Sequence, residues 1–249
     1  MATTESSELA RDGKWLDVAM SLLLPRRCPM CGITLHDRER AWCEACEASM
    51  RVYDRPICRE CRRFLPIGTS TCPTEHDPGE PAVVYAVGSF DDAFGVMVHA
   101  LKYDGYRGLA GPLGRLIAAR ITCREYTSVV AVPTSAKKKR KRGYGHAEEI
   151  GVACAAALGL QWIPDAIQLT RNVADQTRLN ASERKANLAG AFTVRERLSF
   201  TDARVLVVDD VLTTGSTLGE AGRVLQEAGA KSVTGAVVAL NLSMQTRGR

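Results

Sequence analysis

The chain has 249 residues, of which 45% are hydrophobic, so it is long enough for one large domain or for a medium domain and a small module. Its net charge of +5 is modest, and the sequence holds neither an apolar run long enough to span a membrane nor the apolar core of a secretory signal. Neither a membrane span nor a secretory signal is therefore indicated, and we expect a cytoplasmic globular protein.

Seven of the nine cysteines lie from Cys28 to Cys72, and six of them form three C-x-x-C pairs, a pattern that indicates zinc in a reducing compartment. The first four thiols satisfy a tetrahedral ion without leaving an open position, so a structural zinc is predicted rather than a catalytic one. Its ligands are Cys28, Cys31, Cys43 and Cys46. Because so short a segment cannot bury a core of its own, metal binding would supply its folding energy.

A second set consists of Cys58, Cys61 and Cys72 and needs a fourth ligand. We expect His76, because an imidazole is a softer donor than the carboxylate of Glu75. The alternative is that this half is a metal-free copy of the first.

Beyond residue 81, short apolar runs alternate with segments whose apolar residues keep helical spacing. This alternation predicts an α/β fold with a parallel sheet flanked by helices. We expect strands near 82–90, 129–132, 166–169, 205–209 and 232–240. The expected domain organisation is an N-terminal extension with a short helix at 1–24, a double-knuckle zinc module at 25–80, the α/β domain at 82–243 and a tail at 244–249.

The run Val205–Val208 is followed by Asp209, Asp210 and a turn rich in hydroxyls. An apolar strand of this kind belongs in a parallel sheet, where binding sites lie at the carboxyl ends of strands. The turn opens a helix with consecutive backbone N–H groups, which predicts an anion site the size of one phosphate. Its residues are Thr213, Thr214, Gly215, Ser216 and Thr217.

The two carboxylates would repel a phosphate, so we expect them to face sugar hydroxyls and a magnesium ion. The alternative is an ordinary strand that ends in a polar turn, with an aspartate as helix cap.

A second apolar strand, 129–132, leads into Thr134, Ser135 and six consecutive cations, Lys137–Arg142. This charge exceeds what one phosphate requires and would suit pyrophosphate. The alternative is a solvated basic loop, or one that contacts nucleic-acid backbone.

The stretch 170–187 is polar and unusually long for a connection between two strands, which favours a mobile functional lid. Its side chains able to bind oxyanions are Arg171, Gln176, Arg178, Arg184 and Asn187.

Neither the P-loop pattern nor the dinucleotide-binding glycine pattern occurs. The Val205–Thr217 stretch instead resembles the ribose-phosphate loop of type I phosphoribosyltransferases. Over roughly residues 25–240 the chain resembles the ComF family, also called GntX-like or competence protein F. The resemblance rests on the paired cysteine knuckles, Phe90-Asp91, His99–Tyr103 with Gly105, Val132-Pro133, Arg142–Tyr144, Gln176, Arg184, Asn187, Ala191-Phe192 and Val208–Thr217. Two features depart from the family pattern: Gly145-His146 stands where Asn-Gln is usual, and the second cysteine set lacks its last thiol.

The resemblance implies a type I phosphoribosyltransferase fold with a small N-terminal Cys-rich zinc module. It implies 5-phosphoribosyl 1-diphosphate with magnesium as substrate, release of pyrophosphate, and an acceptor that the sequence does not identify. Asp209 and Asp210 would bind the ribose hydroxyls, Thr213–Thr217 the 5-phosphate, and the turn Thr134–Lys137 with Arg142 the pyrophosphate. Arg171 would close over the pyrophosphate. The expected catalytic residues are Asp210 and Arg171.

Members of this family are associated with natural competence and DNA uptake, so DNA or DNA-processing proteins are expected partners. The alternative is a DNA-binding accessory without enzymatic activity, whose pocket senses a metabolite. The modest net charge of +5 argues against a protein that reads duplex DNA.

Overall fold

The computed structural model describes residues 26–37, 40–69, 71–74, 81–122, 125–170 and 188–242. It divides into two compact units, Met1–Met50 and Arg51–Arg249, each of which is described by itself. The second cysteine set therefore lies in the larger unit, whereas the sequence analysis grouped it with the first set. The proposed extension at 1–24 and the tail at 244–249 lie outside the described residues.

In the smaller unit, the first cysteine pair forms a tight knuckle. Gly32 has a φ of +75° and donates its N–H to the Cys28 carbonyl at 2.9 Å, a turn that favours glycine. Helix α2 (Glu44–Ser49) follows Cys43 and buries none of its side chains. With so little apolar packing on this helix, a bound metal is the expected source of order.

The larger unit is built on a six-stranded sheet. In spatial order its strands are β1 (Ile57–Cys58), β2 (Val83–Ser89), β8 (Ser232–Leu240), β7 (Arg204–Leu212), β3 (Ser128–Ala131) and β4 (Gln161–Trp162). β1 is antiparallel to β2 and every other pair is parallel. The central strands are buried almost throughout, as expected for a parallel sheet covered on both faces.

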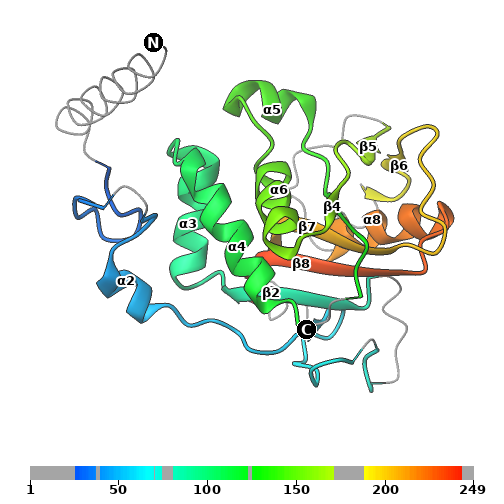
Figure 1. The fold of residues 1–249 in the computed structure, drawn as a ribbon, viewed down its shortest axis with the longest axis horizontal. Coiled ribbons are helices and arrows are strands. Elements are labelled where there is room, and N and C mark those ends of the chain that lie inside the picture. The colour runs from blue at the N-terminus through cyan, green and yellow to red at the C-terminus, as the bar shows by residue number, and fades with distance from the viewer. Residues whose placement is uncertain are drawn as a thin grey trace, which may run out of the picture. The chain divides into compact units, whose positions relative to one another are not determined.

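Helices connect the parallel strands. The chain passes from β2 to β3 through α3 (Ala93–Tyr103), η1 (Arg107–Leu109) and α4 (Ala110–Arg120), and from β3 to β4 through α5 (Ala136–Arg142) and α6 (His146–Leu158). α8 (Ser216–Glu227) joins β7 to β8. α4 and α6 pack side by side (Figure 1). The β2–β3 and β7–β8 connections run in opposite directions across the sheet, so the right-handed rule for parallel crossovers assigns α8 to the other face. The prediction of a parallel sheet flanked by helices is confirmed.

The basic run forms the helix α5 rather than a turn or a loop. Lys and Arg are good helix formers, and the Ser135 hydroxyl caps the helix by accepting the Lys138 N–H at 3.4 Å. Gly143, with a φ of +82°, ends the helix.

The expected strand near 166–169 is β5 (Ile167–Leu169), but it does not join the main sheet. It pairs antiparallel with β6 (Phe192–Val194) in a separate two-stranded sheet. Among the described helices, none combines the length and apolar character that crossing a membrane requires.

The strands β3 and β7 are neighbours, but their connections leave in opposite directions. β3 leads to β4 on one side and β7 leads to β8 on the other. In an open α/β sheet, such a reversal leaves a crevice at the carboxyl ends of the two strands, which is the usual place for a ligand.

Candidate functional site

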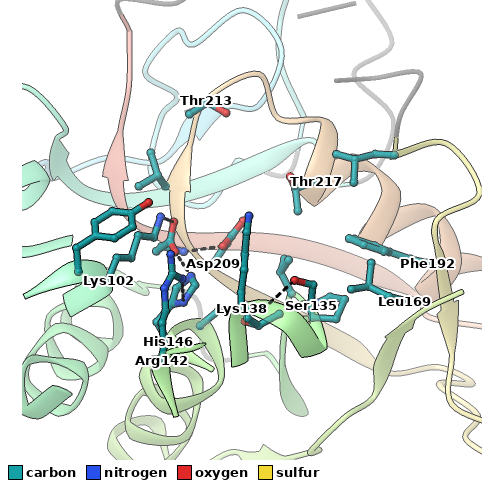
Figure 2. Close-up of a pocket in the computed structure, with 18 residues that line it drawn as sticks. Lys102, Ser135, Lys138, Arg142, His146, Leu169, Phe192, Asp209, Thr213 and Thr217 are labelled. Atoms are coloured by element: carbon teal, nitrogen blue, oxygen red, sulfur yellow. Dashed lines mark hydrogen bonds and ion pairs between the residues drawn. The ribbon is translucent and has the colours of Figure 1, made fainter. Parts of the chain in front are cut away.

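A cavity of about 280 Å³ lies at this crevice (Figure 2). It receives side chains from the end of α3, from the β3–α6 segment and from the end of β7. Its polar lining consists of Lys102, Tyr103, Thr134, Ser135, Lys138, Arg142, His146, Asp209, Asp210, Thr213 and Thr217. Leu169, Leu188 and Phe192 form part of its apolar wall.

The structure brings together most of the residues that the sequence singled out from two distant segments. Asp209, Asp210, Thr213 and Thr217 line the cavity from β7, the loop after it and the first turn of α8, and Thr214, Gly215 and Ser216 lie between the last two. Thr134, Ser135 and Arg142 line it from the other segment.

Lys137 is exposed and does not line the cavity, whereas Lys138 does. The helical form of α5 explains this, because Lys138 and Arg142 are four residues apart and share one face. The predicted lid residues Arg171, Gln176, Arg178, Arg184 and Asn187 lie outside the described residues, as do His76 and Glu75.

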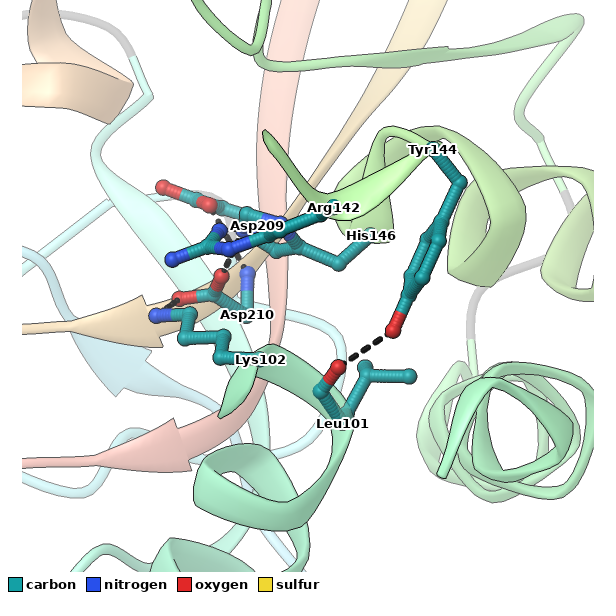
Figure 3. Close-up of polar contacts among 7 residues, drawn as sticks. All are labelled: Leu101, Lys102, Arg142, Tyr144, His146, Asp209 and Asp210. Carbon is teal, nitrogen blue, oxygen red and sulfur yellow. Dashed lines mark hydrogen bonds and ion pairs between the residues drawn. The ribbon is translucent and has the colours of Figure 1, made fainter. Parts of the chain in front are cut away.

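The carboxylate of Asp210 is held by two cationic or titratable side chains (Figure 3). Lys102 Nζ donates to Asp210 Oδ1 at 2.7 Å, and His146 Nε2 contacts Asp210 Oδ2. Burial raises the pKa of Asp210, but Lys102 and His146 outweigh it and hold that pKa below its ordinary value. Asp210 is therefore ionised at neutral pH.

Asp209 behaves differently although it is the adjacent residue. Its Oδ1 accepts the Asp210 backbone N–H at 2.8 Å. Burial, followed by the negative charge of Asp210, raises the pKa of Asp209 to about 7. The pair thus presents one fixed charge and one carboxyl that titrates near neutrality.

Three residues of the site were missed by the sequence analysis: Lys102, Lys138 and His146. Lys102 lies in the His99–Tyr103 segment, but no local pattern shows that the end of α3 meets β7. Arg142 Nη1 lies 3.1 Å from His146 Nδ1, and the Arg142 guanidinium sits 5.1 Å from the centre of the Tyr103 ring. The Arg142–His146 spacing of four residues was visible in the sequence.

The loop after β7 has the features of an anion cradle. Gly215 has a φ of +82° and immediately precedes α8, and the hydroxyls of Thr214 and Ser216 are 3.0 Å apart. Backbone N–H groups at the start of a helix of this length favour an anion.

Two groups of cysteines fit structural zinc. The Sγ atoms of Cys28, Cys31, Cys43 and Cys46 lie within 4.8 Å of one another, and so do those of Cys58, Cys61 and Cys72. Individual Sγ distances are 3.6 Å for Cys31 and Cys43 and 3.7 Å for Cys61 and Cys72. A tetrahedral ion with Zn–S bonds of about 2.3 Å separates its sulfurs by about 3.8 Å, so both groups have the required spacing.

The ionisation of Cys28 also suits a metal ligand. Burial raises the pKa of this thiol, but hydrogen bonds from backbone N–H groups, that of Cys43 first, bring the pKa to about 6. A thiolate is the form that binds zinc.

Comparison with known proteins agrees with both parts of this description. Residues 136–247 match the phosphoribosyl transferase domain and residues 19–75 match the double zinc ribbon domain. The chain is 28% identical to DNA utilization protein YhgH of Escherichia coli over 85% of this chain and 96% of that protein. It is 24% identical to Competence protein F of Haemophilus influenzae, over 83% of this chain and 93% of that protein. Competence protein ComFC of Streptococcus pneumoniae is 21% identical over 83% of this chain and 96% of its own length. The chain thus combines a match to the double zinc ribbon domain with a match to the phosphoribosyl transferase domain, and over most of its length it is similar to Competence protein F.

Proposed function

We propose that this protein binds 5-phosphoribosyl 1-diphosphate with magnesium and transfers the phosphoribosyl group to an acceptor, with release of pyrophosphate. The observation that supports this most strongly is the cavity at the β3–β7 crevice. It places an acidic pair between the anion cradle after β7 and the cations of α5. A sugar with phosphate groups at both ends has this distribution of charge.

In this proposal the backbone N–H groups of Thr213–Thr217 bind the 5-phosphate. Ser135, Lys138 and Arg142 bind the pyrophosphate, with Lys138 in place of Lys137 because only the former lines the cavity. Arg171, which lies outside the described residues, is proposed to close over the pyrophosphate.

Both oxygens of Asp210 already contact Lys102 and His146, so we assign the sugar hydroxyls first to Asp209. Asp210 holds the ammonium of Lys102 and the ring of His146 in the cavity. Two neighbouring carboxylates and the oxygens of a diphosphate are suitable ligands for magnesium, which when bound would offset the negative charge of the pyrophosphate.

The reaction breaks the bond between the anomeric carbon and the pyrophosphate oxygen while an acceptor nucleophile forms a new bond to that carbon. Positive charge develops on the ribose and negative charge on the departing pyrophosphate. The carboxylates of the acidic pair stabilise the positive charge on the ribose, and Lys138 and Arg142 stabilise the negative charge on the pyrophosphate. These groups already stand in place before the reaction. The proposed cellular location is the cytoplasm.

Titration calorimetry with phosphoribosyl diphosphate and magnesium tests this assignment. Replacing both Asp209 and Asp210 with alanine should weaken binding by about 100-fold or more, because the charged hydrogen bonds of Asp209 to the ribose are lost and Lys102 and His146 lose the carboxylate that holds them. The matched control replaces Asp91 and Asp92, an exposed adjacent pair that does not line the cavity. Equal affinity of the Asp209/Asp210 variant and the wild type would rule out the pocket assignment.

A second candidate function is DNA binding without turnover. Lys137, Arg140 and Lys141 are exposed on α5, and they share a face of the helix at i, i+3 and i+4. The names of the relatives, DNA utilization protein and Competence protein, agree with such a role. Filter binding of single- and double-stranded DNA at increasing salt tests it, since phosphate contacts make affinity fall steeply with salt. A slope near zero would remove this candidate.

A further inference from the structure

The cysteine turn Cys58–Arg62 carries two arginines, Arg59 and Arg62, that contact backbone carbonyls of the anion cradle after β7. Arg59 Nη1 donates to the Gly215 carbonyl at 3.1 Å, and Arg62 Nη2 donates to the Thr213 carbonyl at 2.6 Å. Their exposed fractions are 8% and 7%, so both guanidinium groups are packed inside the larger unit. Residues far apart in sequence, in the cysteine knuckle and the cradle, are therefore joined directly.

These contacts set the direction of two peptide groups in the cradle. The Thr213 carbonyl shares a peptide with the Thr214 N–H, and the Gly215 carbonyl shares one with the Ser216 N–H. In a trans peptide the N–H points opposite to the carbonyl. With both carbonyls bound by arginine, the N–H groups of Thr214 and Ser216 are directed away from the knuckle. Arg62 thereby opposes a flip of the Thr213–Thr214 peptide that would turn a carbonyl oxygen toward a bound phosphate. Arg59 adds to the hold on the Gly215–Ser216 peptide, whose carbonyl also accepts the Gly219 N–H at 2.8 Å.

The fit around Arg59 leaves little freedom. Arg59 Nε also donates to the Pro81 carbonyl at 2.9 Å. A Cβ atom added at Gly215 would lie 3.0 Å from Arg59 Cγ, and one added at Gly219 would lie 2.8 Å from Arg59 Nη1. The small residues of the cradle and of the first turn of α8 thus make room for this side chain.

Contacts within the cysteine turn fix the positions of the two arginines. Arg59 lies between the two cysteines, and the Arg62 backbone N–H donates to the Cys58 carbonyl at 3.0 Å. Arg62 has a φ of +60°, a conformation that L side chains rarely adopt, and its Nη1 donates to the Arg59 carbonyl. Ligation of the thiols of Cys58, Cys61 and Cys72 by one ion would fix this turn.

We propose that Arg59 and Arg62 are positioning residues that hold the anion cradle in its anion-binding form. The second cysteine site in this proposal holds the two arginines in place. This inference rests on the proposed function for the identity of the anion. It gives the second half of the zinc ribbon a role in ligand binding, not only in folding.

The first test compares wild type with Arg59→Met and Arg62→Met by titration calorimetry. The probes are ribose 5-phosphate, which needs the cradle, and pyrophosphate with magnesium, which needs the α5 side of the cavity. We expect ribose 5-phosphate affinity to fall at least 10-fold in each variant while pyrophosphate affinity stays within 2-fold of wild type. The control is Arg63→Met, which removes an exposed arginine of the same turn and should change neither.

A general structural defect would weaken both ligands together, and that result would overturn the proposal, as would unchanged ribose 5-phosphate affinity. If the wild type binds neither phosphoribosyl diphosphate nor ribose 5-phosphate, the proposed function fails, and the next measurement still decides the role of the arginines.

The second test needs no ligand and measures hydrogen exchange of the Thr214 and Ser216 amides in the full chain. We expect exchange at least 10-fold faster in Arg59→Met and Arg62→Met. Removal of zinc from the wild type with a chelator should raise the exchange rate of these amides by a similar factor. In the variant that lacks both arginines, the same treatment should raise the exchange rate by a smaller factor. The proposal would be overturned if neither the arginine substitutions nor the removal of zinc changed the exchange rate of these amides. Arg62→Lys keeps the charge with a shorter reach, so it provides a second variant should the methionine variants fold poorly.

Discussion

Two adjacent aspartates at the end of β7 acquire different ionisation states from their surroundings. Asp210 is held as an anion by Lys102 and His146, whereas burial and the charge of Asp210 raise the pKa of Asp209 to about 7. The sequence shows two identical side chains in a row. Their different environments arise because the strand alternates its side chains between two faces, and Lys102 and His146 approach only one of them.

The raised pKa of Asp209 predicts a pH dependence of stability. The folded state keeps a proton that an unfolded aspartate, with a pKa of about 3.9, has already lost. Stability should therefore fall as pH rises from about 4 and level off above the folded pKa of about 7. Between about pH 6 and pH 8 this carboxyl should lower the free energy of unfolding by about 1 kcal/mol.

Urea unfolding of wild type and Asp209→Asn at pH 6 and pH 8 measures this effect, and zinc-saturated protein should be used throughout. The wild type should lose more stability than the variant over this interval. A pH dependence that is the same in both proteins would show that Asp209 does not titrate there.

At the scale of elements, α5 separates its six cations onto two sides. Lys138 and Arg142 line the cavity, and Lys139 Nζ pairs with Glu148 at 2.7 Å. Lys137, Arg140 and Lys141 are exposed. One short helix could therefore serve a small-molecule anion on one side and a polyanion on the other.

Two sets of variants distinguish these roles. Replacing Lys138 and Arg142 with alanine should weaken phosphoribosyl diphosphate binding by about 10-fold or more, because charged hydrogen bonds to phosphate are lost. Replacing Lys137, Arg140 and Lys141 should leave that affinity unchanged and should lower any DNA affinity and its salt slope. Calorimetry with phosphoribosyl diphosphate and filter binding with DNA, each on both variants, check these expectations. If both variants change the two affinities equally, the two faces of α5 do not have separate roles.

At the scale of the whole chain, the sequence predicted the α/β fold, because buried parallel strands appear as apolar runs such as Val205–Val208. It also predicted the acidic pair and the hydroxyl-rich turn as parts of a site. It did not predict that the basic run is helical, because charge alone does not distinguish a solvated loop from a short capped helix. Contacts of Lys102 with Asp210 and of Arg59 with Gly215 could not be predicted, since they depend on packing between distant segments.

The metal content of the purified chain is a further expectation at this scale. Both cysteine groups have the sulfur spacing of tetrahedral zinc, so we expect two zinc ions per chain. His76→Ala should lower this to one, and Glu75→Ala should not, if His76 is the fourth ligand of the second site. Elemental analysis checks these values. A folded chain without metal would contradict both zinc assignments.

The most direct test of the account is the structure of the protein in complex with phosphoribosyl diphosphate and magnesium. We predict the 5-phosphate at the N–H groups of Thr213–Thr217, the ribose hydroxyls at Asp209, and the pyrophosphate at Ser135, Lys138 and Arg142. A ligand bound elsewhere, or a cavity that stays empty at saturating ligand, would contradict the claim that this crevice is a phosphoribosyl diphosphate site.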